Sequence, residues 1–358
     1  MSFDPTTLPQ SWPAPSAPRP IVVLGAGGIV RDAHLPAYRK AGLPVAGVFD
    51  IDTARAAALA AQFGLRAYAS LADAVAEPNA VFDLATPPAA HLELLRALPD
   101  GAVALIQKPM GRSLDEATAI LHLCHEKRLT AAVNFQLRFA PMVLPLRAAI
   151  AAGHLGRIVD VEVHLNLVTP WHLFPFLKGL DRVEIAVHSI HYLDLIRAVL
   201  GNPIGVHART LGHPNNDLAQ TRTAAILDFA PDVRCVLSIN HDHNFGRRFQ
   251  DAKFRFEGDN GAAVIQMGLL LDYPRGEPDE LWLNASGDWV QVPIAGSWFP
   301  DAFIGRMANL QRFAAGEDDK LESSVDDAWH TMALVEACFR AAAAPATPVP
   351  ATPVPAAP

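Results

Sequence analysis

The sequence is poor in the features that bind polyanions or membranes. Lys and Arg number 29 against 37 Asp and Glu, so the formal net charge of this 358-residue chain is −8. This acidic excess argues against nucleic acid or an anionic membrane as a partner. The chain has no apolar run of the roughly 18 residues that a transmembrane helix needs, and residues 1–19 lack the apolar stretch of a secretory signal. We therefore expect a cytoplasmic protein.

Cysteine is scarce as well. Cys124, Cys235 and Cys338 lie far apart in the chain and form no closely spaced pair of the kind that ligates zinc. This usage is typical of a reducing compartment and predicts three buried thiols. The cysteines therefore predict no metal site.

The sequence does contain enough apolar material for a large core. Hydrophobic residues make up 51% of the chain and charged residues 18%, and the length predicts about two domains. We expect a Pro-rich flexible tail at residues 1–19, a first domain at 20–140, a second domain at 141–342, and a flexible Ala/Pro-rich tail at 343–358.

In the first domain, short apolar runs alternate with helical segments. Strand-like runs occupy 21–24, 45–49, 81–85, 103–106 and 131–134. The segments between them, such as 53–63, 89–98 and 114–127, are rich in Ala and Leu with a period near 3.6. Alternating strands and helices predict a parallel, doubly wound α/β sheet.

The second domain has a different texture. Residues 158–167 alternate apolar and polar side chains, and further strand-like runs follow at 204–210, 221–229, 233–241, 252–257, 262–267 and 281–284. Such strands predict a large, mostly antiparallel sheet with one open side. Helices are expected at about 183–200 and 325–342, and the second has Ser324 and Asp327 at the spacing of a helix cap.

A glycine-rich turn follows the first strand. The sequence Gly25-Ala26-Gly27-Gly28-Ile29-Val30 comes directly after residues 21–24. Gly25 permits a tight turn, Gly27 lets the main chain approach a pyrophosphate, and the N-terminus of the next helix offers free N–H groups. We expect Gly25, Gly27, Gly28 and Ile29 to contact a dinucleotide. Val30 stands where Gly or Ala is usual.

Asp50 strengthens the dinucleotide interpretation, because it lies at the end of the second strand. A carboxylate there accepts hydrogen bonds from both hydroxyls of an adenosine ribose and repels a 2′-phosphate. The sequence therefore predicts NAD as the cofactor, with NADP possible. A purely structural glycine turn is the alternative.

Lys108 is the first candidate for chemistry. Gln107-Lys108-Pro109 follows the strand 103–106, and the carboxyl ends of strands in a doubly wound sheet face the ligand crevice. A residue before proline is held extended, which directs its side chain. Lys108 could hydrogen-bond both a substrate hydroxyl and the nicotinamide ribose. The alternative is a solvated surface lysine.

Other polar groups also follow predicted strands and could face a polar ligand or only pack within loops. These candidates are Thr86, Pro87, His91 and Gln136 for the cofactor, Arg138, Trp171 and His172 for the substrate, and His241-Asp242-His243 at the end of a later strand.

Glu184, His188 and His191 are spaced by four and three residues, so they lie on one stripe of the expected helix, with Asp194 one step further. Three interpretations stay open. The stripe could carry a catalytic histidine, it could form a zinc site, or it could be a polar helix face satisfied within the core.

Taken together, these motifs resemble the glucose–fructose oxidoreductase/inositol dehydrogenase (Gfo/Idh/MocA) family over residues 20–342. The order and spacing of the motifs carry the resemblance: Gly25–Val30 with His34-Leu35-Pro36-Ala37, Thr86-Pro87 with His91, Lys108-Pro109, Arg138–Pro141, His191–Leu195 with Leu200-Gly201, and Ser324–Ala328. The resemblance implies a Rossmann domain and a second α/β domain whose open sheet mediates dimers or tetramers. It implies hydride transfer between nicotinamide and a carbon of a sugar, sugar lactone or cyclitol.

In the residues, the resemblance implies that Lys108 polarises the substrate and that His191 is the general acid/base. The substrate would be bound by Lys108, Arg138, Trp171, His172, His188 and His191, and no metal is expected. The chain departs from the family at Gln107, where Glu is usual, and at Val187, where Asp is frequent. In the family that Asp stands four residues before the catalytic histidine. Glu184 precedes His188 by the same four residues, so Glu184 and His188 could take over these roles one helical turn earlier. A redox-neutral, NAD-dependent glycosidase and a non-catalytic dinucleotide sensor are the alternatives in function.

Overall fold

The computed structural model describes residues 4–229, 231–285 and 287–349. The first domain is built on a six-stranded parallel sheet with the order β3-β2-β1-β4-β5-β6. Its strands are β1 (Ile21–Leu24), β2 (Val45–Phe49), β3 (Arg66–Ala67), β4 (Val81–Leu84), β5 (Val103–Ile106) and β6 (Thr130–Val133). The predicted doubly wound sheet is confirmed. Strand β3 is new, because two residues are too few to leave a pattern in the sequence.

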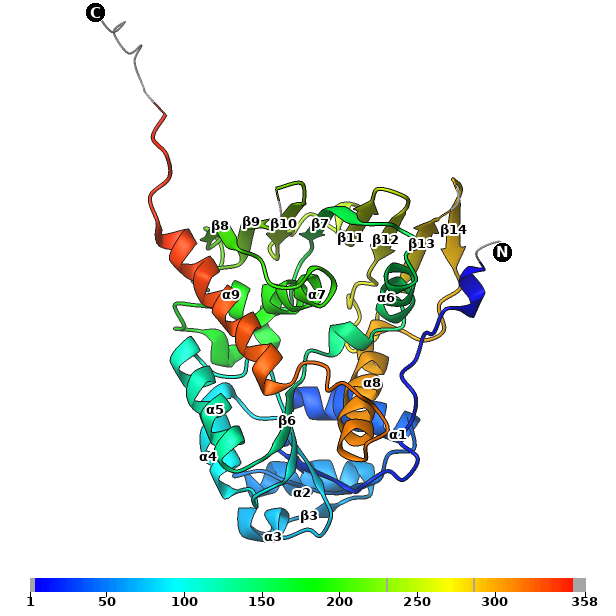
Figure 1. Ribbon diagram of the computed structural model, residues 1–358. Helices are drawn as coiled ribbons and strands as arrows, with labels where there is room; N and C mark the ends of the chain where they lie inside the picture. The colour runs from blue at the N-terminus through cyan, green and yellow to red at the C-terminus, as the bar shows by residue number, and fades with distance from the viewer. Residues whose placement is uncertain (1–3, 230, 286, 350–358) are drawn as a thin grey trace, which may run out of the picture.

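Helices cover both faces of this sheet, as the Ala/Leu-rich segments predict (Figure 1). They are α1 (Leu35–Lys40), α2 (Thr53–Phe63), α3 (Leu71–Val75), α4 (His91–Ala97) and α5 (Leu114–Glu126). Helix α2 begins where the Asp52 side chain accepts a hydrogen bond from the Arg55 N–H, and it ends at Gly64, whose φ of 70° suits glycine. Strands β1, β4 and β5 are buried along their whole length.

The second domain carries an eight-stranded sheet in the order β14-β13-β12-β11-β7-β10-β9-β8. The strands are β7 (Ile158–Asn166), β8 (Gly205–Leu211), β9 (Arg222–Asp228), β10 (Arg234–Asn240), β11 (Asp251–Gly258), β12 (Ala262–Gln266), β13 (Glu280–Asn284) and β14 (Trp289–Val292). Neighbouring strands are antiparallel except for the parallel pair β7–β10. The mostly antiparallel sheet is therefore confirmed.

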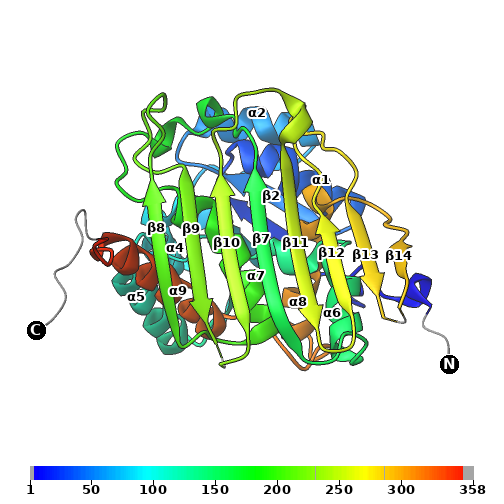
Figure 2. The same ribbon diagram turned by 90° about the horizontal axis from the view of Figure 1, so that it is seen from above.

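One face of this sheet packs on helices and the other is open (Figure 2). Helices α6 (Val143–Ala151), α7 (Ile190–Leu200) and α9 (Val325–Ala343) lie between the large sheet and the first domain (Figure 1). In β7, Val161, Val163 and Leu165 point to the helices and are buried. The alternate residues Asp160, Glu162 and His164 lie on the open face and are partly exposed.

Helix α8 (Trp298–Ala314) joins the two domains. It follows the last strand of the second domain but contacts α1, β5 and β6 of the first. Its Met307 and Leu310 belong to the same buried cluster as Ile21 and Val23 of β1. The sequence analysis did not predict α8, and the domain boundary at 140/141 is correspondingly blurred, because the first domain is completed by a helix from far along the chain.

The N-terminal segment differs from the flexible tail expected at 1–19. Over its described part, the Trp12 indole N–H donates to Asp318 at 2.7 Å and its ring packs edge-on against Phe139 at 5.1 Å between centroids. The Gln10 side chain donates to the Pro293 carbonyl and accepts from the Ala295 N–H. These contacts bind residues 4–19 along α8 and the outer strand. Of the expected C-terminal tail at 343–358, residues 350–358 lie outside the described residues.

The three cysteines are buried and unpaired, as predicted, and burial raises the pKa of each thiol to about 12. Within residues 4–229, 231–285 and 287–349, no helix is long and apolar enough to cross a membrane.

Candidate active site

The turn after β1 uses its two key glycines differently. Gly25 has a φ of +117°, and a Cβ atom there would lie 2.4 Å from the carbonyl oxygen of Ala85 after β4. Only glycine fits this position. A Cβ on Gly27 would meet no heavy atom within 4 Å, and Gly28 and Ile29 follow on the accessible side. The turn thus packs against the sheet on one side and leaves room for a phosphate on the other.

Asp50 follows β2 and directs its carboxylate at this turn. Its Oδ2 accepts a hydrogen bond from the Ala26 N–H at 2.7 Å, and its Oδ1 accepts one from the Asp52 N–H at 2.9 Å. The Arg55 guanidinium lies 3.8 Å from Oδ2. Because each carboxylate oxygen has a second lone pair, the fixed side chain can still accept hydrogen bonds from a ribose diol.

The turn after β4 lies beside the glycine turn. The Thr86 Oγ1 is buried and finds no hydrogen-bond partner within the described structure, and Pro87 beside it is exposed. His91 is buried and reaches the main-chain carbonyls of Thr86, at 3.0 Å, and Met110, at 3.3 Å. Burial lowers the pKa of this imidazole. His91 therefore shapes the turn, and the Thr86 hydroxyl is left for a ligand.

Gln107 takes part in a buried polar network. The His34 Nδ1 lies 2.6 Å from Asp83 Oδ2, which also accepts the Tyr38 hydroxyl at 2.8 Å. The amide nitrogens of Gln107 and Asn134 face the His34 Nε2 at 3.2 and 3.4 Å. Since amide nitrogens only donate, Nε2 must carry the lone pair, and the Nδ1–H donates to Asp83. Gln107 therefore fixes the tautomer of His34, which a carboxylate at position 107 would not do.

Lys108 stands at the carboxyl end of β5, where the sequence predicted it. The Gln107 Oε1 accepts its N–H at 2.8 Å. Its Nζ donates to the Val187 carbonyl oxygen at 3.1 Å, across the space between the domains. Burial lowers the pKa of the ammonium to about 8. Val187 has no carboxylate to offer, but its main-chain oxygen orients the lysine.

His188 and His191 stand beside Lys108. The Nδ1 of each ring is buried and has no partner in the part of the chain that the structure describes. Burial lowers the pKa of His191 well below its ordinary range, and the Lys108 charge lowers it further. Burial has the same effect on His188, reinforced by His241, Lys108 and His191. Both imidazoles are therefore neutral near pH 7 and able to accept a proton.

The spacing of Glu184 and His188 predicted a contact between them, but Glu184 instead contacts Ser189 and His241. It accepts the Ser189 hydroxyl at 2.8 Å, and the His241 Nε2 lies 3.3 Å from its Oε1. The Thr169 hydroxyl lies 2.8 Å from the other nitrogen of His241. The His188 ring packs on the His241 ring with centroids 4.4 Å apart. Glu184 thus supports His188 through His241. The sequence marked His241 only as a polar residue at a strand end and did not predict its contacts with Glu184 and His188.

Trp171 encloses the histidines from the second domain. Its ring lies edge-on to His188 at 5.1 Å and to His241 at 5.6 Å, and its buried indole nitrogen has no partner among the described residues. His172 is exposed and lines a pocket of about 700 Å³. Arg31, in the π-helical segment Val30–His34 that begins at the end of the glycine motif, lines the same pocket. Only its position directly after the motif could have marked Arg31 in the sequence.

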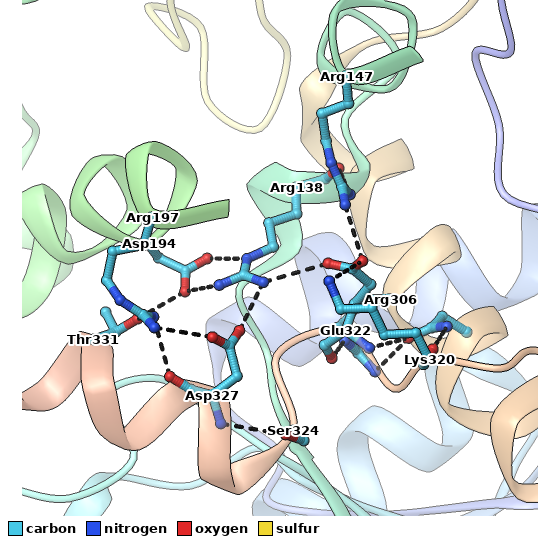
Figure 3. Close-up of polar contacts among 11 residues, drawn as sticks. Arg138, Arg147, Asp194, Arg197, Arg306, Lys320, Glu322, Ser324, Asp327 and Thr331 are labelled. Carbon is cyan, nitrogen blue, oxygen red and sulfur yellow. Dashed lines mark hydrogen bonds and ion pairs between the residues drawn. The ribbon is translucent and has the colours of Figure 1, made fainter. Parts of the chain in front are cut away.

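Two of the predicted site residues, Gln136 and Arg138, are buried in the protein interior. Gln136 is buried at the start of a 3₁₀ turn after β6. Arg138 is buried in a group of charges, with both oxygens of Asp194 at 2.6 Å from its guanidinium (Figure 3). Asp327 and Glu322 engage its remaining nitrogen at 2.8 and 3.3 Å. With three carboxylates around it, Arg138 has no N–H directed at a substrate.

The zinc interpretation of the α7 stripe is not supported. Across the described ranges, no three His, Cys, Asp or Glu side chains are grouped so as to hold a metal ion. The remaining arrangement fits a dinucleotide, because an open glycine turn, a fixed carboxylate and an unpartnered Thr86 hydroxyl line one edge of the sheet.

Comparison with known proteins gives a consistent result. A family model for an oxidoreductase family with an NAD-binding Rossmann fold matches residues 19–135, and the C-terminal-domain model of the same family, GFO/IDH/MocA, matches residues 143–264. The chain is 27% identical to D-xylose 1-dehydrogenase (NADP(+)) 2 of Haloferax volcanii, over 58% of this chain and 65% of that one. It is 30% identical to inositol 2-dehydrogenase of Leifsonia xyli, over 64% and 67%.

Among solved structures, an oxidoreductase from Agrobacterium radiobacter in complex with NAD+, L-tartaric acid and magnesium superposes with a TM-score of 0.76. The two chains are 20% identical, and the match covers 91% of this chain and 97% of that one. At this identity the likeness bears on the fold alone.

Proposed function

Because the chain belongs to the GFO/IDH/MocA family of NAD(P)-dependent oxidoreductases, we propose that it transfers a hydride between NAD and a hydroxyl-bearing carbon of a sugar, sugar lactone or cyclitol. The observation that carries the proposal is the meeting of Lys108 with His188 and His191. A lysine at the end of a Rossmann strand and two neutral imidazoles from the second domain face one another there.

In this proposal Lys108 stabilises charge on the reacting oxygen and His191 transfers the proton. Lys108, protonated below its pKa of about 8, donates to the reacting oxygen and stabilises the negative charge that develops on it. His191, which is neutral, takes the proton that the hydroxyl loses, and its unpartnered Nδ1 is available for this. Bound NAD accepts the hydride in oxidation. In the reverse direction Lys108 polarises a carbonyl and His191 returns the proton.

The side chains around this point favour a neutral polyol. They are imidazole and indole groups with one ammonium, and the carboxylate of Glu184 is buried against Ser189 and His241. The names of two relatives, a D-xylose 1-dehydrogenase and an inositol 2-dehydrogenase, support the same class here, whereas two others are named for UDP-N-acetylglucosamine and glucose-6-phosphate. Trp171 and His172 are proposed to bind the substrate ring.

A spectrophotometric screen tests the proposal. Purified enzyme is incubated with free pentoses, hexoses, their lactones and cyclitols, each with NAD and with NADP, and nicotinamide absorbance is followed. We expect reduction of NAD with at least one neutral polyol. Cleavage of a glycoside without net NADH would instead indicate redox-neutral chemistry. Cofactor binding with no turnover of either kind would indicate a sensor.

We further propose that the enzyme is a cytoplasmic homodimer or homotetramer that associates through the open face of the large sheet. This face carries Ile226 on β9, which is 49% exposed and pairs with Val236 of β10 and His207 of β8. A broad, uncovered sheet face with apolar side chains is typical of an interface.

A further inference from the structure

A group of buried charges joins both domains, and we call it the Arg138 cluster (Figure 3). Arg138 follows β6 at the end of the first domain, and its carboxylate partners come from α7, from α9 and from the connection between α8 and α9. The other members are Arg147 on α6, Asp194 and Arg197 on α7, Arg306 on α8, Glu322, and Asp327 and Thr331 on α9. Arg138 is 2% exposed and Asp194 is 1% exposed, so this is an interior site.

The contact between Arg138 and Asp194 is the most directional in the cluster. The Nε and Nη2 atoms donate to the two oxygens of the carboxylate, both at 2.6 Å. This paired geometry fixes the plane and direction of both side chains, which a single ion pair does not. The Thr331 hydroxyl adds a hydrogen bond to Asp194 at 2.9 Å. Asp194 is therefore held in one orientation from two sides.

Asp194 lies on the same helix as His191, three residues further on, which is less than one turn. On the N-terminal side of the histidines, the Val187 carbonyl in the turn before α7 accepts a hydrogen bond from the Lys108 ammonium. Lys108 follows β5 and Arg138 follows β6, and these strands are neighbours in the first-domain sheet. The segment that carries His188 and His191 is thus attached to the first domain at two points, one on each side of the histidines.

The free-energy cost of burying Arg138 and Asp194 also indicates that this pair orients α7 rather than stabilises the fold. Burial raises the pKa of Asp194 although Arg138 lowers it, so the charged carboxylate is costly to bury even with its partner. A buried ion pair contributes little net stability compared with apolar residues of the same volume. Its two parallel hydrogen bonds do, however, specify one rotation of α7 about its axis.

We propose that Arg138 and Asp194 are positioning residues, whose paired hydrogen bonds set the rotation of α7 and thereby the placement of His191 against Lys108. The proposal rests on the proposed function of His191 as acid/base, but its central claim concerns geometry and can be measured without a substrate. The groups that act electrostatically on His191 and its neighbour His188 are Lys108 and His241.

The test compares Arg138→Lys and Asp194→Asn with the matched control Arg147→Lys. Arg147 donates to Glu322 and to the main-chain carbonyl of Arg138 but to no residue of α7, and lysine at this position leaves the Arg138 side chain unchanged. Titration of ¹⁵N-labelled imidazoles by NMR reports on His191, whose signals are assigned by their loss in His191→Gln. Melting temperature, the Kd for NAD and, with a substrate from the screen, kcat complete the measurements.

In both test variants we expect the His191 titration to move up toward the ordinary value of about 6.5, because a displaced imidazole is less buried and lies further from Lys108. We expect kcat to fall about 10- to 100-fold, as for a small misplacement of a reacting group, with the Kd for NAD unchanged. The control is expected to change only the melting temperature. If Arg138→Lys does not fold, Asp194→Asn, which keeps the side-chain shape, decides.

Three results would overturn the proposal. One is an unchanged His191 titration in the folded test variants, the second a shifted titration with unchanged kcat, and the third an equal effect in Arg147→Lys. A shifted titration in a protein that turns over no polyol supports the positioning role and counts against the proposed function instead.

Discussion

The carboxylate of Asp50 determines the cofactor choice that we expect. It is fixed by two main-chain N–H groups and faces the glycine turn. Repulsion of a 2′-phosphate by a like charge near a protein surface costs on the order of 1–4 kcal/mol. We therefore predict a higher kcat/KM with NAD than with NADP, and a rise of about tenfold or more in the NADP/NAD ratio for Asp50→Asn. Asp52→Asn, two residues further along the chain, is the control. A wild-type preference for NADP would contradict this assignment.

Removing the Lys108 ammonium should separate catalysis from stability. Its pKa in the folded protein, about 8, lies below the ordinary value of about 10.4, so the buried ammonium destabilises the fold at pH below about 8, and the cost is lost as pH rises through about 10.4. At pH 7, Lys108→Met should lower kcat by about 10²–10³ while the melting temperature stays the same or rises. The NAD affinity, measured by fluorescence, should change little. A threefold loss of kcat or less rules out the catalytic role.

The pH profile of kcat/KM should be bell-shaped, because activity needs neutral His191 and charged Lys108. The acid limb is expected below pH 6.5, because burial and then Lys108 lower the pKa of His191. The alkaline limb is expected near pH 8, where Lys108 loses its proton. In Lys108→Met the alkaline limb should disappear and the acid limb should move up. A profile with the same two limbs in this variant would show that other groups titrate.

His191 and His188 make different contributions in our interpretation. Both imidazoles adjoin Lys108, but the His188 ring also packs on His241 and Trp171, whereas the ring partner of His191 is Phe135. Loss of a general base costs about 10²–10⁴-fold in rate, and we predict that His191→Ala reaches this range and His188→Ala does not. Steady-state kcat for the two variants is the measurement. The reverse order would make His188 the base, supported by Glu184 through His241.

At the scale of elements, the sequence predicted most strands of both sheets but not the geometry around α7. Strand positions follow from local apolar runs, and these match β7 to β13 closely. The stripe of Glu184, His188 and His191 assumed a uniform period of 3.6. Residues Ile185–Ser189 instead form a π-helical turn, which inserts extra rotation. Glu184 therefore faces Ser189 and His241, and no local residue pattern marks such a turn.

Other misses have the same physical origin, because they depend on contacts between distant segments. Arg138 was a candidate for the site because it follows the end of a strand. Its guanidinium instead forms ion pairs with Asp194, Glu322 and Asp327. The partnership of Glu184 with His241 joins residues from α7's leading turn and the end of β10. Lys108, Asp50 and Gly25 could be predicted because the parallel sheet brings the ends of adjacent strands together without help from other segments.

The bound N-terminal segment provides a test at the same scale. Trp12 packs on Phe139 and hydrogen-bonds Asp318, so its removal should lower the free energy of unfolding. We predict a loss of about 2 kcal/mol for Trp12→Ala, less than the 3–5 kcal/mol of a fully buried Trp. Urea denaturation measures it. Trp289→Ala, at a position that is 48% exposed on the edge strand, is the control and should change little. Equal values for both variants would mean that the segment contributes no stability.

At the scale of the whole molecule, the open sheet face leads to a prediction of assembly. We expect sedimentation to give a dimer or tetramer, and we expect Ile226→Glu, on the second strand from one edge of that face, to weaken it because a charge would be buried between copies. A charge substitution at exposed Ile51, near the nucleotide turn, should leave the assembly intact. A monomer at micromolar concentration would refute the proposed interface.

The crossing of α8 from one domain to the other affects how the protein is made. Met307 and Leu310 fill the same core as Ile21 and Val23, although nearly the whole chain separates them. During translation, the nucleotide-binding half emerges first and waits with an incomplete hydrophobic surface until α8 leaves the ribosome. Contacts of such large sequence separation form slowly, and exposed apolar surface in the meantime favours aggregation. This enzyme should therefore need chaperones during synthesis more than its two-domain outline would imply.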